Sequence, residues 1–336
     1  MTNFNSVGDL ARSHQLRLSQ SAMKSKLAEL SGEVTSGIKS DIPAALGGDM
    51  VRISQVESRL GMLSVLGQNL AQAETFLSGL QTSLTSMHTL VSGTIPTLLS
   101  DSLLSSDTAL QVQLKKGPED LRSVLQMLNQ SVAGRHIFSG SGSTGLAVVQ
   151  YDTLMAQVGT AVSGLTDPDQ IVAGIDAYFD AAPGSGGFAD LGYLGGAAAS
   201  DIPIGPGQKV SVGITANSAE LSEMLKGLAI LAYAAENPQL GTSVARKLTK
   251  DAASRLATGE LDLISAQGSI GMQEERLARV RVANQAEVSA LTIARNGMIS
   301  ADPFESASAL EELATNVEAL YALTARLSKL NLTDYL

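Results

Sequence analysis

The most regular feature of the sequence is the spacing of its hydrophobic residues, which recur at alternating three- and four-residue steps over several long segments. This spacing is typical of helices that pack along a narrow seam. The longest unbroken example comprises Leu63, Leu66, Leu70, Ala73, Leu77, Leu80, Leu84, Met87 and Val91. At about 1.5 Å of rise per residue, it predicts a helix of about 40 Å.

Both ends of the chain carry a seam of the same kind. At the N-terminal end, polar Gln20 interrupts the apolar positions and Gly37 is placed to end the helix. The apolar positions there are Leu16, Met23, Leu27, Leu30 and Val34. At the C-terminal end, Asp302, Pro303 and Glu305 form a helix-start signal. The apolar positions that follow are Leu310, Leu313, Val317, Leu320 and Leu327, with Thr324 in the same seam and Leu323 and Leu330 on one flank.

A narrow apolar seam has to be covered by another helix. We expect residues 1–38 and 302–336 to form a coiled-coil pair, and we predict that their seam residues also form an assembly interface with other copies of the chain. In an isolated monomer such a seam would be poorly buried, so we expect both terminal segments to be mobile before assembly.

The helical body is predicted in two halves, and residues 39–139 form the first. Its long helix is expected to weaken or end at residues 92–96, which contain Gly and Pro. A further helix is predicted from about residue 107 to 133, with Gly117 and Pro118 as a kink or break.

Residues 217–301 form the second half of the predicted body. A helix begins near Ser218, and another long run follows Pro238 to about Gly297. One seven-residue phase contains Leu256, Leu263, Ile270, Leu277, Asn284 and Leu291, and its partner phase contains Gln273, Val280, Glu287 and Ala294. Polar residues in such a seam weaken it but specify its register.

Between the two halves, residues 140–216 lack the seam pattern and are rich in Gly, Pro and Asp. Two short helices are predicted near 151–163 and 168–180. Alternating apolar residues in 202–214, on either side of Gly-Pro-Gly, predict a β-hairpin. The sequence therefore predicts a small α+β outer insert domain on a helical body.

The composition fits bundles of long helices and excludes several other classes. The 336 residues include no Trp and only 4% aromatic residues, and the net charge of -10 lacks a basic patch for nucleic acid. Cysteine is absent, which excludes disulfides and thiolate metal sites. The first residues do not have the pattern of a signal peptide, and no apolar run reaches the about 18 residues of a membrane span.

Motifs that carry chemistry are few. Residues 140–145 match G-x-G-x-x-G, but a helix is predicted before them and no strand, so a flexible hinge between body and insert is a better interpretation than a dinucleotide site. His14, His88 and His136 lack the spacing of a metal pair. Adjacent glutamates at 274–275 and 311–312 point in different directions on a helix, so they suit solvated faces better than an acid–base pair. We predict no enzyme, no cofactor and no metal.

Three segments together resemble a known family. They are Leu30-Ser31-Gly32 with Thr35-Ser36-Gly37 and Asp41-Ile42-Pro43-Ala44-Ala45, then Gly134-Arg135-His136-Ile137-Phe138-Ser139-Gly140, and Leu330-Asn331-Leu332-Thr333-Asp334-Tyr335-Leu336. In order and placement they resemble bacterial flagellins and the related flagellar hook–filament junction protein (hook-associated protein 3). His136 stands where the family commonly has Tyr. Residues 37–41 lack the Arg-Ile-Asn and paired Asp of filament flagellins, which favours the junction protein.

The resemblance covers about residues 1–140 and 217–336. It implies a mainly α fold, a flagellin-like rod of long antiparallel helices with paired terminal helices. It also implies an extracellular structural role, joining hook to filament as a helical ring of copies of this chain. The implied partners are hook-associated protein 1 on the hook side, flagellin on the filament side, and a cytoplasmic chaperone during type III export.

Two other hypotheses remain open at this stage. The chain could be a divergent flagellin that forms the filament itself, which self-polymerisation of the pure protein would favour. It could instead be a secreted binding module or enzyme that uses the insert at 140–216, which a tight small-molecule site there would favour.

Overall fold

The computed structural model describes residues 5–100, 106–142, 145–211 and 213–333, and of the side chains before residue 14 or after residue 326 only that of Ala11. The chain forms two compact units. Unit 1 comprises residues 1–63 and 285–336, and unit 2 comprises residues 64–284. Both boundaries fall inside long helices, so each of these helices contributes residues to both units.

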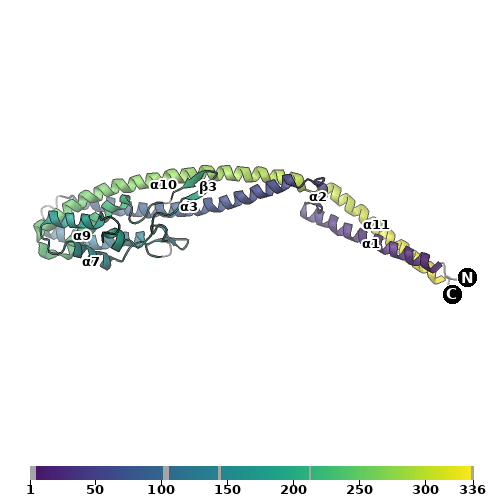
Figure 1. Ribbon diagram of the computed structural model, residues 1–336, viewed down its shortest axis with the longest axis horizontal. Coiled ribbons are helices and arrows are strands. Elements are labelled where there is room, and N and C mark those ends of the chain that lie inside the picture. Colours follow the sequence, from purple (N-terminus) through teal and green to yellow (C-terminus); the bar gives the residue numbers. More distant parts are fainter. Residues whose placement is uncertain (1–4, 101–105, 143–144, 212, 334–336) are drawn as a thin grey trace. The chain divides into compact units, whose positions relative to one another are not determined.

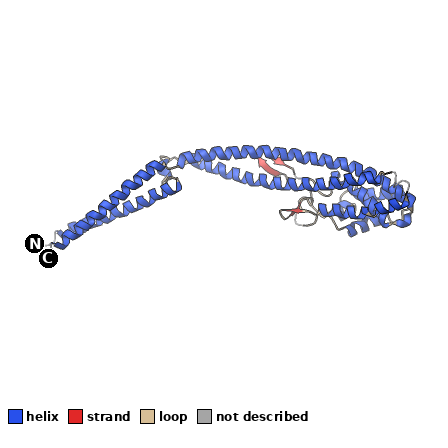
Figure 2. Ribbon diagram, turned by 180° about the vertical axis from the view of Figure 1, so that it is seen from behind, coloured by secondary structure: helices blue, strands red, loops and turns tan. Residues whose placement is uncertain are grey.

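The predicted fold class, mainly α with a small α+β insert, is confirmed (Figures 1 and 2). The α-helices are α1 (Asn5–Ser36), α2 (Ile42–Ala45), α3 (Val51–Leu98), α5 (Asp107–Leu114), α6 (Lys116–Leu128), α7 (Tyr151–Ala161), α8 (Pro168–Phe179), α9 (Ala219–Glu236), α10 (Thr242–Ile299) and α11 (Pro303–Thr333). Single turns of π- and 3₁₀-helix occur at η1 (Phe188–Gly192) and η2 (Pro238–Leu240). The described strands form two antiparallel hairpins, β1 (Ser131–Val132) with β2 (Arg135–His136) and β3 (Ile202–Gly205) with β4 (Gln208–Val210).

In unit 1, the segment that follows α1 lies beside the segment that connects α10 to α11. Gly37 ends α1 with a φ of 69°, and the N–H of Lys39 donates to the carbonyl of Ile299 at 2.9 Å. The N–H of Ala301 donates back to the carbonyl of Gly37 at 3.0 Å. This short antiparallel bridge joins the exit from α1 to the connection between α10 and α11, so the predicted glycine stop also fixes where the two terminal helices meet.

Helix α3 buries the seam that its sequence predicted. Leu80, Leu84, Met87 and Val91 are completely inaccessible to solvent. The helix does not end at residues 92–96, which corrects the prediction: it continues through Pro96 to Leu98. Proline cannot donate a backbone hydrogen bond, but Ile95 and Leu98 on either side of it are buried, and this packing holds the last turn in place.

The break between α5 and α6 falls at Lys115, slightly before the predicted Gly-Pro pair. Gly117 lies inside the first turn of α6, against the backbone of α9. A β-carbon at this position would lie 2.9 Å from the carbonyl carbon of Leu231. Glycine is therefore needed for the close approach of two helices rather than to break one of them.

The core of unit 2 joins the helices to the insert. Fully buried Leu80 and Leu84 of α3 belong to the same hydrophobic cluster as Leu154 of α7, Ile171 of α8 and Ile204 of β3. Helices α7 and α8 begin at the predicted residues and end one or two residues early. The insert thus shares one core with α3, α6, α9 and α10.

The two hairpins have different origins in the sequence. The β3–β4 hairpin was predicted, although its second strand is described only as far as Val210 and residue 212 lies outside the described residues. The β1–β2 hairpin was not predicted. The helix expected to run to about residue 133 ends at Leu128, and Ser131–Val132 form β1 instead. The hairpin's turn residues Ala133 and Gly134 have φ angles of 50° and 78°, as a tight hairpin turn requires. Its second strand, Arg135–His136, lies in the second of the three family-like segments.

Helix α10 is continuous from Thr242 to Ile299, through Gly268 and Gly271. Leu256, Leu263 and Ile270 of its predicted phase are buried. Packing of this face against α3 and α9 compensates for the weak helix preference of the two glycines.

Candidate assembly surface

The terminal helices α1 and α11 pack against each other in unit 1 and run antiparallel (Figure 1). The hydroxyl of Ser306, near the start of α11, donates to Glu33 Oε2 near the end of α1 at 3.4 Å. Further along the pair, Lys24 Nζ lies 5.9 Å from the ring centre of Tyr321. The hydrogen bond from Lys24 lowers the pKa of Tyr321. These contacts fix the register of the two helices.

The predicted seam residues line this contact but are not equally buried. Leu30 is the only one of the described set that is buried, at 8% exposure. Those that are half-buried are Leu16, Met23, Leu27, Leu310, Leu313, Val317 and Leu320. Because one helix covers only one side of its neighbour, a two-helix pair leaves its seam residues partly in water.

Two predicted positions are exposed. Val34 is 42% exposed because the facing stretch of α11, residues 306–309, contains only Ser and Ala. Leu323 is 57% exposed, as a flanking rather than central position would be. The side chains of Leu327 and Leu330 lie outside the described residues.

Glu33 organises the junction at the base of the pair. Its Oε1 accepts the N–H of Ser40 at 2.8 Å, while its Oε2 accepts from Ser306, a residue only 6% exposed. Ser40 in turn donates its hydroxyl to the carbonyl of Glu29 at 3.1 Å. One carboxylate thus connects α1, the segment that follows it, and α11. Sequence reasoning missed this role, although Ser306 falls on the seam phase of α11.

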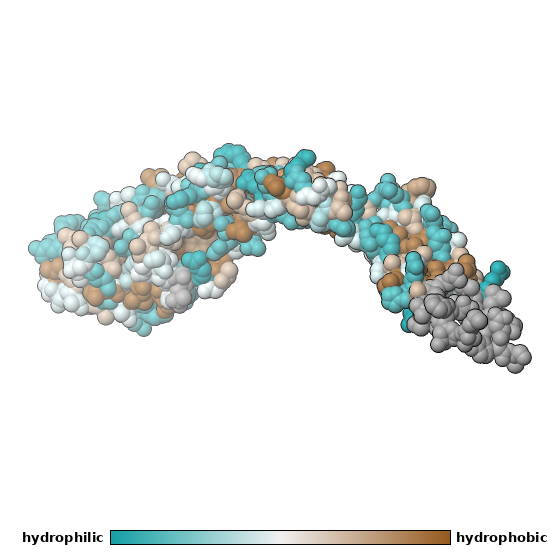
Figure 3. All heavy atoms as spheres, turned by 45° about the vertical axis from the view of Figure 1, so that its right-hand side comes forward, coloured by the Kyte–Doolittle hydropathy of each residue, from teal (hydrophilic) through white to brown (hydrophobic). Residues whose placement is uncertain are grey.

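Unit 1 also exposes large apolar side chains. Phe304, in the first turn of α11, is 83% exposed, and Leu18 of α1 is 58% exposed. In the space-filling view, hydrophobic residues reach the surface of the terminal pair between hydrophilic ones (Figure 3). Exposed apolar groups of this size often mark surfaces that are covered in an assembly.

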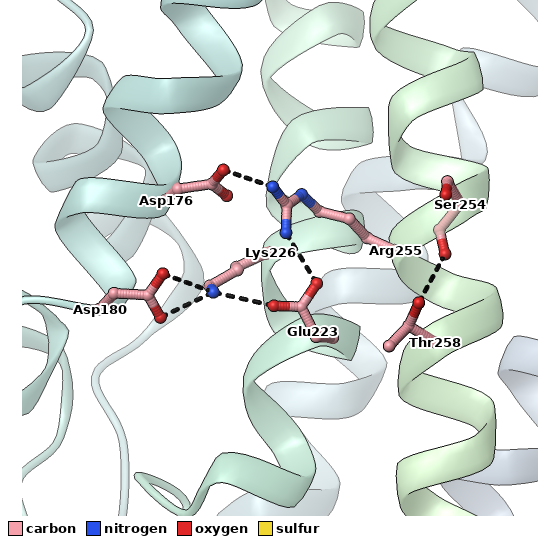
Figure 4. A network of polar contacts seen from close by, with 7 residues as sticks. All are labelled: Asp176, Asp180, Glu223, Lys226, Ser254, Arg255 and Thr258. Atoms are coloured by element: carbon pink, nitrogen blue, oxygen red, sulfur yellow. Dashed lines mark hydrogen bonds and ion pairs between the residues drawn. The ribbon is translucent and has the colours of Figure 1, made fainter.

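The strongest polar cluster of unit 2 joins α8, α9 and α10 (Figure 4). Lys226 Nζ donates to Asp180 at 2.7 Å and to Glu223 at 2.9 Å, and its side chain is only 5% exposed. Arg255 donates to Glu223 Oε2 at 2.7 Å and also pairs with Asp176. The spacing of Glu223 and Lys226 was the only sequence signal for this cluster.

Burial and pairing oppose each other in this cluster. Burial disfavours the charge of Glu223, but the hydrogen bonds from Lys226 and Arg255 outweigh it and lower its pKa. Burial also opposes the charge of Lys226, and the bonds to Asp180 and Glu223 raise its pKa in spite of it. Burial dominates at Asp176, whose pKa is raised and whose Oδ1 is buried without a partner.

A pocket of about 380 Å³ lies beside this cluster, between α8, η1 and the start of α9. The charged side chains that line it are Asp180, Glu223 and Lys226. All three already have an ion-pair partner, since Asp180 and Glu223 both bind Lys226. The cluster therefore acts as a structural connection between helices.

The glycine-rich stretch at 140–145 has a packing explanation where it is described. A β-carbon on Gly140 would lie 2.3 Å from the carbonyl oxygen of Ala197, and one on Gly142 would lie 3.0 Å from the N–H nitrogen of Gly196. The N–H of Ser141 also donates to Ala197 at 2.8 Å. These glycines allow two backbone segments of the insert to meet. Residues 143 and 144 lie outside the described residues.

The histidines and carboxylates do not converge on a site. His88 Nε2 lies 3.4 Å from Glu260 Oε1, and His136 Nδ1 lies 2.8 Å from the carbonyl of Asn129. Glu275 pairs with Arg279 on the same helix. Within the described part of the chain, no three His, Asp or Glu residues are grouped closely enough to hold a metal ion. No described helix has the length and apolar character that a membrane crossing needs.

Comparison with known proteins gives limited information. No protein-family model matches the chain, and no curated protein matches it. One similar solved structure is titled as a flagellar hook-associated protein from Vibrio parahaemolyticus, with 13% identity over 74% of this chain and 96% of that chain, at a TM-score of 0.47. Another is FlgL from Bacillus cereus, with 16% identity, the same coverage and a TM-score of 0.40. Likenesses this low assign neither a family nor a function.

Proposed function

We propose that this protein is a structural subunit of the bacterial flagellum that joins the hook to the filament by helical self-assembly. The observation that carries the proposal is the terminal pair of α1 and α11, whose seam residues stay half-buried in the single chain. Contacts between copies would complete their burial. The family-like segments in the sequence supply the flagellar context, and the departure at residues 37–41 favours the junction over the filament.

Physical reasoning supports a role in assembly rather than in catalysis. The strongest polar cluster, around Lys226, is internally paired, and the seam residues of α1 and α11 leave apolar surface to be covered. A contact between two different faces of identical chains, if it does not close, generates a helical array. In this proposal copies of the chain stack in a helical ring, with hook-associated protein 1 on the hook side and flagellin on the filament side.

The proposal includes a route to the cell exterior. The chain would pass unfolded through the flagellar type III apparatus, and the absence of cysteine would prevent a crosslink from trapping it. A cytoplasmic chaperone would cover the C-terminal segment before export, because its seam would otherwise associate too early.

The test is a deletion of the gene in its own host, followed by imaging of the cell surface and assay of flagellin in the medium. Bare hooks with flagellin shed into the medium would support the junction role. Bare hooks without flagellin in the medium would show instead that this chain is the filament subunit. Normal filaments in the deletion strain, with no second copy of the gene, would contradict both flagellar roles.

A further inference from the structure

Charge is separated between the two helices of the terminal pair. Residues 14–28 of α1 contain Arg17, Lys24 and Lys26 and no acidic residue. Residues 303–325 of α11 contain four glutamates and no Lys or Arg. These four, Glu305, Glu311, Glu312 and Glu318, are all exposed. None of them forms an ion pair with a described side chain. These two segments therefore carry opposite charge. On α1, Lys26 pairs with Glu29 at 2.7 Å, so Arg17 and Lys24 supply the basic face.

The phase of the seam explains why the glutamates stay unpaired. Counted from the seam at Leu310 and Leu313, they occupy the positions that face away from α1. Phe304 lies seven residues before Glu311, which lies seven before Glu318, so an exposed aromatic ring shares this acidic face. On α1, Arg17 and Lys24 are also seven apart, and exposed Leu18 follows Arg17. Each helix thus presents charge together with one exposed apolar side chain.

We infer that the acidic face of α11 in one copy binds the basic face of α1 in a second copy. This inference rests on the proposed function and specifies the contact that builds the array. A second copy is the favoured occupant because one chain carries both complementary faces, so every copy can supply what its neighbour needs. The faces are different surfaces, so the contact is heterologous and repeats from copy to copy.

The positions of the two faces along the pair also set a stagger. Lys24 lies level with Tyr321, and Glu33 lies level with Ser306. The middle of the acidic face lies between Ser306 and Tyr321 along α11. It is therefore level with residues 24–33 of α1, whereas the basic face lies at residues 17–24. Neighbouring copies must shift along the helix axis for the two faces to meet. A shift of this kind gives a helical array rather than a flat closed ring.

The first experiment reverses charge on one face at a time, in the gene-deletion strain supplied with each variant. One variant carries Glu311→Lys and Glu318→Lys, and the other carries Arg17→Glu and Lys24→Glu. The readout is the amount of this chain in sheared, purified extracellular appendages. Each variant alone should fall about tenfold or more, because several weak ion pairs become repulsions. Expressed together, the two variants should restore incorporation, since each then finds its complement on the other.

Controls separate charge reversal from damage to the helix pair. Glu57→Lys changes an exposed glutamate of α3 and should leave incorporation unchanged. Tyr321→Leu removes the ring over which Lys24 lies and should also leave incorporation unchanged, which excludes loss of that internal contact as the cause. Normal incorporation of either reversed variant alone would overturn the inference, and so would failure of the mixture when both purified chains keep wild-type helical content.

The second experiment traps the contact with cysteines, since the natural chain has none. Ser21→Cys lies between Arg17 and Lys24, and Thr315→Cys lies among the glutamates, so all charges are kept. The two positions face outward from different helices and cannot bond within one chain. Oxidation of assembled material should give a ladder longer than a dimer, whereas Ser21→Cys alone should stop at dimers. If the wild-type chain is found in the appendages but the double variant gives no ladder, the inference is overturned and the proposed function stands. If the wild-type chain is absent from the appendages, both are overturned.

Discussion

Arg59 of α3 and Glu287 of α10 form an ion pair through two contacts, with Arg59 Nε 2.7 Å from Oε1 and Nη2 3.0 Å from Oε2 of the same carboxylate. Both residues belong to unit 1. Glu287 was predicted to occupy a seam phase, and its partner explains how a carboxylate is tolerated there. A two-point pair of this geometry fixes the relative register of the two helices.

We expect the register function of this pair to survive exchange of the charges but not loss of one. The hydrogen bond from Arg59 lowers the pKa of Glu287. The stability that the ionised Glu287 gives to the folded state is therefore present above the ordinary pKa of a glutamate and is lost as the pH falls through the lowered value. Arg59→Glu should speed amide exchange in this part of α3 and α10, and adding Glu287→Arg should slow it again. Equal exchange in the single and double variants would contradict a register role.

The seam of the terminal pair should be sensitive to a buried charge. Leu27→Asp places a carboxylate in the half-buried seam opposite α11, which should separate the helices and remove helical signal measured by circular dichroism. Ser25→Asp, two residues away on an exposed position, is the matched control and should retain the signal.

Limited proteolysis tests the expected mobility of the two terminal segments. The wild-type monomer should be cleaved first within residues 1–35 and 302–336, and strong protection there would contradict our expectation of mobile termini.

Removal of Lys226 should destabilise unit 2. In Lys226→Met, Glu223 keeps its bond to Arg255, and Asp180 is 59% exposed. The variant should therefore lower the free energy of unfolding by about 1–3 kcal/mol, which is less than the loss expected when a fully buried pair is broken. Denaturant unfolding would measure it. Lys247→Met, which removes a more exposed pair with Asp169, is the control and should cost clearly less than Lys226→Met. Equal costs for the two variants would mean that burial of Lys226 does not matter.

The same cluster predicts a pH dependence. Because the pKa of Glu223 is lowered, the stability that its ionised carboxylate gives to the folded state is present above the ordinary pKa of a glutamate. It is lost as the pH falls through the lowered value. Asp176 opposes this trend because its pKa is raised, so its protonation favours the folded state. The difference in unfolding free energy between wild type and Glu223→Gln should therefore shrink on acidification. A difference that stays constant down to about pH 3 would contradict the role of the Glu223 charge.

Asn129 should be important for holding the insert. Its Oδ1 accepts the N–H groups of Ala147 and Val148 at 2.8 and 2.9 Å, and its Nδ2 donates to the carbonyl of Val148 at 3.0 Å. Asn129→Ala leaves these backbone groups without partners and should cost about 2–3 kcal/mol in unfolding free energy. Asn69→Ala, which removes one exposed bond to Pro203, should cost about 1 kcal/mol or less. Similar costs would indicate that water replaces the bonds of Asn129.

The sequence by itself determined the helices and their buried faces. The three- and four-residue spacing of apolar residues from Leu63 to Val91 identified the buried side of α3, because the buried face of a helix follows from residue spacing. The glycine at residue 37 and the Asp-Pro start at residues 302–303 likewise placed helix ends, since caps depend on a few neighbouring residues. The seam residues of α1 and α11 were also identified in this way, although not how much of each remains exposed.

The tertiary structure alone decided features that depend on residues far apart in sequence. Pro96 stays inside α3 because the helix is held by packing, which outweighs a local break signal. Gly117 is required by the backbone of Leu231, and the Lys226 cluster joins three helices, relationships that no local pattern encodes. The charges of α1 and α11 can be read from the sequence, but only the register of the pair placed the acidic face away from α1 and put the two faces at different levels. Local preferences specify elements, whereas contacts between distant residues specify which faces remain free.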